Sequence, residues 1–203
     1  MAKQMIPPIF YKHKHHWKAQ SMLNREFKDM FVAEIISMTG GLLAGTLIAI
    51  YIDKILLIPG LFILLPGFLE MRGNISGALA ARLGTALDLK KIPAIISKNG
   101  DVKQNILATF VEVLVVALSL AAVAYVVTYF IFGSATLLIF WIAIIAALIS
   151  NFIEVALTTY TTFWLFKKGH DPNDIMGPYV TTTGDIVSVA SLLLAITIVI
   201  WIV

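Results

Sequence analysis

The chain has 203 residues, of which 59% are hydrophobic and only 13% are charged, with a formal net charge of +3 and no cysteine. A water-soluble domain of this length needs far more polar surface, so the composition predicts an integral membrane protein. The absence of cysteine excludes disulfides, thiolate metal sites and cysteine nucleophiles.

The N-terminal stretch MAKQMIPPIFYKHKHHWK is basic and contains two adjacent prolines, unlike the apolar core of a cleavable signal peptide. We therefore expect insertion through the first membrane helix. Residues 17–30, WKAQSMLNREFKDM, predict a short amphipathic helix that lies along the inner membrane surface and contacts lipid. The expected organisation is a basic cytoplasmic segment at 1–30, followed by a membrane domain at 31–203.

Hydropathy divides the membrane domain into candidate spans, each near the roughly 20 residues that a bilayer requires. They are expected at 31–52, 55–74, 105–131, 135–166 and 178–203. The second is expected to continue as a helix to about residue 89, since NISGALAARLGTALDL has good helix formers and no proline. Pro93, Asn99 and Gly100 then mark a loop, and FGSA marks a short turn. The predicted fold class is all-α and integral membrane, with five transmembrane helices per chain.

The distribution of Lys and Arg orients these helices. All of the Lys and Arg residues except Lys54 lie on one side of the predicted bundle. By the positive-inside rule that side is cytoplasmic, which predicts an internal N-terminus and an external C-terminus in the plasma membrane. This bias explains the positive net charge without nucleic acid, so we expect no nucleic-acid partner.

Polar side chains inside the predicted spans are functional candidates, because lipid makes them costly. Each span carries one about 18 or 19 residues from its external end, which places them in one layer roughly 27–29 Å below the outer face. An acid near the inner interface can also reach water or pair with a basic residue, so a structural role for any single one stays open. Negative charge in the layer favours a hard cation such as Mg²⁺ or Ca²⁺. The layer contains Glu34, Asn74, Glu112, Glu154 and Asp185.

The fifth span follows the segment GHDPNDIMGPYVTTTGDIVSVAS. Asp171 is a predicted N-cap, with a proline at the first helical position. Thr181, Asp185 and Ser188 lie at helical spacing and share a face. Such hydroxyls can bond back to the preceding turn, but a polar stripe around a carboxylate favours a water-filled pathway.

The second span carries Glu70 and Asn74 four residues apart, on one helix face. Arg72 lies between them, and it either pairs with Glu70 or alters ion selectivity. Small residues along the same helix allow close backbone approach to a neighbour. They are Gly73, Gly77, Ala80 and Gly84.

In these two spans the sequence resembles the membrane domain of the MgtE-type magnesium transporters, and most closely their eukaryotic solute-carrier branch. The second span has P-x(6)-G-N followed by a small-residue helix, between Pro66 and Arg82. The fifth has D-P followed by a P-x-x-T-T-x-x-D-like run. Its matching residues are Asp171, Pro172, Pro178, Thr181, Thr182 and Asp185.

The resemblance implies a parallel homodimer in which the second and fifth spans line a central pathway for Mg²⁺, the transported ion. It assigns to Asp185 the acid that holds a hydrated ion, beside Asn74 and the backbone carbonyl of Thr181. An odd number of spans leaves an antiparallel dimer formally open. Together with the polar layer, the candidate metal-site residues are Asp185, Asn74, Thr181, Glu112, Asp171, Thr182, Gly73, Glu34 and Glu70.

The expected function is therefore divalent-cation transport, with Mg²⁺ as the expected ion, and no enzymatic activity; selectivity among Mg²⁺, Mn²⁺, Co²⁺ and Ca²⁺ stays open. Whether the protein is a channel or an Na⁺- or H⁺-coupled exchanger stays open. GALAAR followed by Asp88 faintly resembles the CDP-alcohol phosphotransferases, metal-dependent membrane enzymes, but Asn74 stands where their first acid is needed. A non-transporting accessory subunit is the third alternative, which the intramembrane acids disfavour.

Overall fold

The structure is a computed structural model that describes residues 15–95 and 100–202, with side chains from residue 27 onward. Within these ranges the chain is helical apart from short connections and contains no strand, which confirms the all-α prediction. The helices are α1 (His15–Ile50), α2 (Ile52–Leu56), α3 (Leu61–Asp88), α4 (Gly100–Phe132), α5 (Leu138–Lys167) and α6 (Pro172–Ile202).

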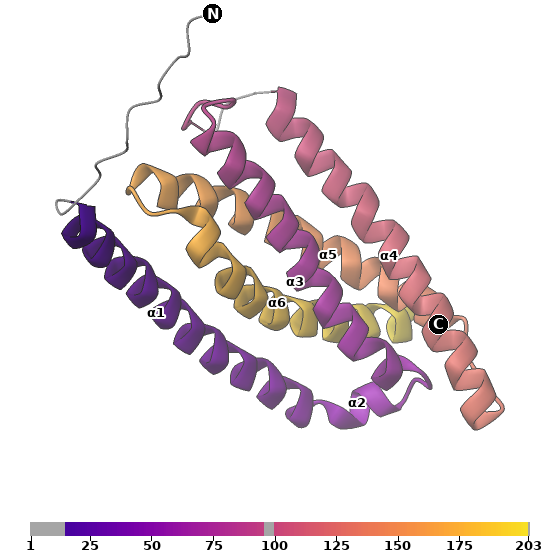
Figure 1. Ribbon diagram of the computed structural model, residues 1–203. Coiled ribbons are helices and arrows are strands. Elements are labelled where there is room, and N and C mark those ends of the chain that lie inside the picture. The colour runs from indigo at the N-terminus through magenta and orange to yellow at the C-terminus, as the bar shows by residue number, and fades with distance from the viewer. Residues whose placement is uncertain (1–14, 96–99, 203) are drawn as a thin grey trace, which may run out of the picture.

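Helix α6 is the central element, because it packs against α1, α3 and α5 (Figure 1). Helix α4 packs on the other side, against α3 and α5. Rows of alanine let α4 and α5 approach their neighbours closely. The fully buried alanines are Ala117, Ala121, Ala143, Ala146 and Ala147. The buried apolar residues of the α3–α6 bundle form one large cluster and two smaller ones, and α1 lies at the edge of the bundle against α6.

The amphipathic segment predicted at 17–30 is not a separate helix. Helix α1 runs from His15 to Ile50 without a break, so this segment and the first span form one element. Neither proline nor glycine occurs between residues 15 and 39, and the backbone therefore has no local cause to bend at the membrane surface. The basic residues 1–14 lie outside the described ranges.

The second predicted span begins later than expected. Its first residues form the short α2, and the chain then turns at Pro59 and Gly60 before α3 begins at Leu61. Gly60 has φ 91°, and a Cβ added there would lie 2.5 Å from Thr128 Oγ1 and 3.0 Å from Ile139 Cδ1. A residue with a side chain would be strained in this backbone and would collide with α4 and α5. The hydropathy of residues 55–74 therefore gave no sign of this tightly packed turn.

Among the described residues, four helical segments are long and apolar enough to cross a membrane. They are Phe27–Ile50 within α1, Gly100–Phe132, Leu138–Lys167 and Pro172–Ile202. Helix α3 has 28 residues, which at 1.5 Å per residue gives about 42 Å. Its polar residues lower its hydropathy, so a fifth span remains a prediction.

The predicted connections are found near their expected positions. Helix α3 ends at Asp88 and Pro93 follows in the connection, while Asn99 lies outside the described residues and Gly100 already begins α4. The turn FGSA falls in the break between α4 and α5. At the start of α6 the backbone N–H of Asn173 donates to Asp171 Oδ1 at 2.8 Å, which confirms the predicted N-cap.

Candidate metal pathway

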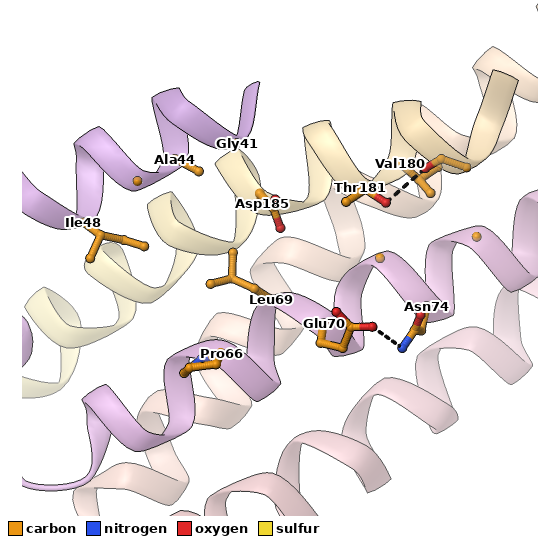
Figure 2. A pocket seen from close by; sticks show the side chains of 14 residues that line it. Gly41, Ala44, Ile48, Pro66, Leu69, Glu70, Asn74, Val180, Thr181 and Asp185 are labelled. Carbon is orange, nitrogen blue, oxygen red and sulfur yellow. Dashed lines mark hydrogen bonds between the residues drawn. The ribbon is translucent and has the colours of Figure 1, made fainter. Parts of the chain in front are cut away.

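An open pocket of about 650 Å³ lies between α1, α3 and α6 (Figure 2). We call it the α1–α3–α6 pocket. Its polar side chains come from α3 and α6, while α1 contributes only small and apolar residues. The lining residues are Gly41, Ala44, Gly45, Ile48, Pro66, Leu69, Glu70, Gly73, Asn74, Gly77, Gly177, Val180, Thr181 and Asp185.

Helical spacing explains which side chains reach the pocket. Glu70 and Asn74 are four residues apart on α3, and Thr181 and Asp185 are four apart on α6. Residues at this spacing lie one above the other on one helix face. Each helix therefore presents two successive turns of polar groups to the same space, as Figure 2 shows.

The α1 wall leaves room because it is built from small residues. A Cβ added at Gly41 or Gly45 would meet no heavy atom within 4 Å. Gly40 differs, because it faces α6 rather than the pocket, and an added Cβ would overlap the Thr182 methyl group. Gly40 is thus where the α1 backbone approaches α6.

The pocket is electrostatically negative. Glu70 and Asp185 are close enough to repel each other, and no Lys, Arg or His occurs among the residues that line it. Asn74 Nδ2 donates to Glu70 Oε1 at 3.1 Å, and Thr181 Oγ1 donates to the carbonyl oxygen of Gly177 at 3.1 Å (Figure 2). The amide of Asn74 thereby holds one carboxylate in place while the other, on Asp185, faces it across the pocket.

Most of the metal-site residues predicted on α3 and α6 come together here. The pocket contains Glu70, Gly73, Asn74, Thr181 and Asp185. Of the five polar groups predicted to share one depth, only Asn74 and Asp185 line it. Equal depth therefore did not imply a common site.

The other candidates lie elsewhere. Thr182 packs toward Gly40 and donates to the carbonyl oxygen of Pro178 at 2.8 Å, and Asp171 caps α6. Glu112 belongs to α4 and Glu34 is exposed on α1, and neither lines the pocket. Within the part of the chain that the structure describes, no three Asp, Glu or His side chains are placed to ligate one metal ion.

Glu70 and Arg72 do not pair with each other, as the sequence had allowed. Arg72 is fully buried, and its Nη1 donates to Asn151 Oδ1 on α5 at 3.2 Å. Glu154, also fully buried on α5, accepts a hydrogen bond from Thr183 Oγ1 at 3.5 Å. Residues two apart on a helix face in different directions, so the spacing of Glu70 and Arg72 already argued against their pairing. The partner of Arg72 on α5 had no sequence signal.

Comparison with known proteins adds an independent line of argument. A family model described as MgtE, divalent cation transporter, matches residues 65–195, which include most of α3 and α6. Mouse solute carrier family 41 member 2 is 28% identical over 136 residues, corresponding to 64% of this chain and 24% of the mouse protein. The chain thus spans about a quarter of that relative. No solved structure is significantly similar to this chain.

Proposed function

The chain belongs to the MgtE family of divalent cation transporters, and we propose that it carries Mg²⁺ across the membrane through the α1–α3–α6 pocket. The membership confirms the resemblance identified in the sequence. It also agrees with the prediction that the chain is not an enzyme, because the family is one of transporters.

The observation that carries the proposal is the pairing of Asp185 with Glu70. Two carboxylates on different helices face one open pocket and repel each other, with no basic side chain lining it. Such an arrangement is unfavourable until a cation enters between the acids. Asn74 and Thr181 add side-chain oxygen atoms, which can ligate Mg²⁺ or accept hydrogen bonds from its water molecules.

The size of the pocket favours an ion that keeps its water. Mg²⁺ dehydrates reluctantly and usually retains several water molecules in proteins. Six waters occupy roughly 180 Å³ at about 30 Å³ each, whereas the pocket measures about 650 Å³. Asp185, Glu70 and Asn74 would therefore contact the hydration shell rather than replace it.

We propose further that two parallel copies of the chain enclose the pathway, with α3 and α6 as its lining helices. Glu70, Asn74 and Thr181 are exposed in the single chain, and lipid tails offer no hydrogen-bond partners for them. A second copy would cover them with its own polar face. The proposed arrangement includes α3 as a fifth span, with residues 1–30 inside the cell and 31–203 in the plasma membrane.

Flux measurements test this function. Proteoliposomes with a trapped Mg²⁺ indicator should show uptake with the wild-type chain, and Asp185→Asn should reduce the rate at least about tenfold, because the pocket loses one of its two charges. Asp53→Asn is the matched control, since Asp53 is exposed on α2 outside the pocket.

Equal flux in wild type and Asp185→Asn would refute the site. No flux of any divalent ion from folded wild-type protein would refute transport and leave the accessory-subunit alternative. Dependence of the rate on voltage alone would indicate a channel, and dependence on an Na⁺ or proton gradient would indicate an exchanger.

A further inference from the structure

A second group of polar side chains lies on the far side of the pocket wall, between α3, α5 and α6. We call it the buried polar cluster. It contains one cation, Arg72, and one acid, Glu154, both with no exposed surface. Its hydrogen bonds join Arg72 to Asn151 and Thr183 to Glu154.

Only the backbone of α6 and α3 separates this cluster from the pocket. On α6, Thr183 donates to Glu154 in the cluster, and Asp185 lines the pocket. Gly184 lies between them and packs on α3, where an added Cβ would be 3.7 Å from Arg72 Cβ and 3.9 Å from Gly73 N. Gly184 therefore lies directly against the α3 residue that carries the guanidinium.

The cluster is not satisfied by its own contacts. Arg72 Nε and Nη2, Asn151 Nδ2 and Glu154 Oε1 have no hydrogen-bond partner among the described residues. The hydroxyls of Ser76, Thr158 and Ser188 likewise have none. Buried polar atoms without partners are rare and require an explanation. A purely structural cross-link between helices would be expected to use the guanidinium fully.

The charges of the buried polar cluster also act on the pocket. Arg72 bonds to Asn151, which is three residues from Glu154 on the same face of α5, so the two opposite charges lie close together. Glu154 bonds to Thr183, two residues from Asp185 on α6. In an interior of low effective dielectric constant, charges interact more strongly at a given distance than they do in water. A cation beside Asp185 is therefore attracted by Glu154 and repelled by Arg72.

We propose that Arg72 and Glu154 form a buried counter-charge pair that sets the affinity of the pocket for divalent cations, an inference that rests on the proposed function. Glu154 strengthens cation binding at Asp185, and Arg72 weakens it to a level from which the ion can leave. A transport site needs both properties, because an ion that binds too tightly is not released. Both residues act through the pocket acids and do not touch the ion.

Removing each of the two charges separately should have opposite effects on the Kd for Mg²⁺. Glu154→Gln keeps the shape of the side chain but leaves Arg72 uncompensated, so the Kd for Mg²⁺ should rise on the order of tenfold. Arg72→Met removes the cation that repels Mg²⁺ and, measured at mildly alkaline pH so that the uncompensated Glu154 carboxylate stays ionised, should lower the Kd by a similar factor. The double variant Arg72→Met/Glu154→Gln removes both charges and should return the Kd to within about threefold of wild type.

The experiment measures Mg²⁺ binding to the purified full chain in detergent by calorimetry, together with the KM for flux in proteoliposomes. Asp53→Asn serves as the control and should leave both values unchanged. Removing one partner of a buried ion pair is often destabilising, so Arg72→Met can fail to fold. In that case Glu154→Gln alone and the double variant, which carries no unpaired buried charge, decide the matter.

The outcomes separate the inference from the function on which it rests. An unchanged Kd in folded Glu154→Gln, or weaker binding in both single variants, would overturn the counter-charge pair while leaving transport intact. A wild-type chain that neither binds nor carries Mg²⁺ would overturn the proposed function itself. Weakened binding in Glu154→Gln that the double variant restores would support the inference.

Discussion

Replacing Gly40 with alanine tests the contact that places α1 beside the pocket. The added methyl group would overlap Thr182 Cγ2 and would lie 3.2 Å from Thr182 Cβ and 3.7 Å from Thr182 Cα. Threonine is restricted at χ1, and Thr182 Oγ1 donates to the carbonyl oxygen of Pro178 at 2.8 Å. The clash is therefore relieved only by breaking this hydrogen bond or by moving α1 away from α6.

The expected magnitude follows from three effects. Alanine gains about 0.5–1 kcal/mol over glycine inside a helix. Overpacking costs about 1–3 kcal/mol, and a lost hydrogen bond costs about 1 kcal/mol. The net expectation for Gly40→Ala is a destabilisation of about 1–3.5 kcal/mol. Gly41→Ala should instead stabilise by about 0.5–1 kcal/mol, because nothing lies within 4 Å of its added Cβ.

Thermal unfolding in detergent, followed by circular dichroism, measures the difference between the two variants. Thr182→Ser removes the clashing methyl group but keeps the hydroxyl, so Gly40→Ala/Thr182→Ser should recover most of the lost stability. If Gly40→Ala were as stable as Gly41→Ala, or if the serine variant gave no recovery, the close approach of α1 to α6 at this point would be refuted.

Two further tests, each with a matched control, concern the residues that precede α3 and α6. Gly60→Ala should destabilise by about 2 kcal/mol or more, because its φ of 91° strains alanine and the added Cβ lies 2.5 Å from Thr128 Oγ1. Gly133→Ala, with φ 70° but open space around it, should cost only about 1 kcal/mol, and equal melting temperatures for the two would contradict the packing argument. Asp171→Ala removes the cap on the Asn173 N–H and should lower the free energy of unfolding by about 1 kcal/mol, whereas Asp171→Asn should retain most of it. A loss of similar size in the asparagine variant would show that charge rather than capping is responsible.

The features predicted correctly from sequence are those that depend on local spacing. Asp171 was identified as an N-cap because its residue type and the following proline suffice to start a helix. Glu70 with Asn74, and Thr181 with Asp185, were expected to share helix faces because residues i and i+4 do, and both pairs line the pocket; their part in a metal pathway stays a prediction. The family resemblance added the pairing of the second span with the fifth, which no local pattern contains.

Two kinds of feature could not be predicted from the sequence. One is the direction in which a side chain points from its helix, and the other is a contact between residues far apart in the chain. Hydropathy gave a depth for Glu112 and Glu154 but no direction, and their helices turn them away from the pocket. Arg72 meets Asn151, which is 79 positions away in the chain, through packing of α3 on α5. The break at Gly60 is required by tertiary contacts with Thr128 and Ile139, so hydropathy alone could not locate it.

The position of α1 has a mechanical consequence. The helix has 36 residues and lies at the edge of the α3–α6 bundle, where α6 is its main neighbour. Ten residues, the separation of Gly40 from Ile50, span about 15 Å at 1.5 Å per residue, so a tilt of about 10° about Gly40 displaces that end by roughly 2.6 Å. A rotation of α1 about the contact between Gly40 and Thr182 would therefore change the width of the pocket, because Gly41, Ala44, Gly45 and Ile48 of α1 line it.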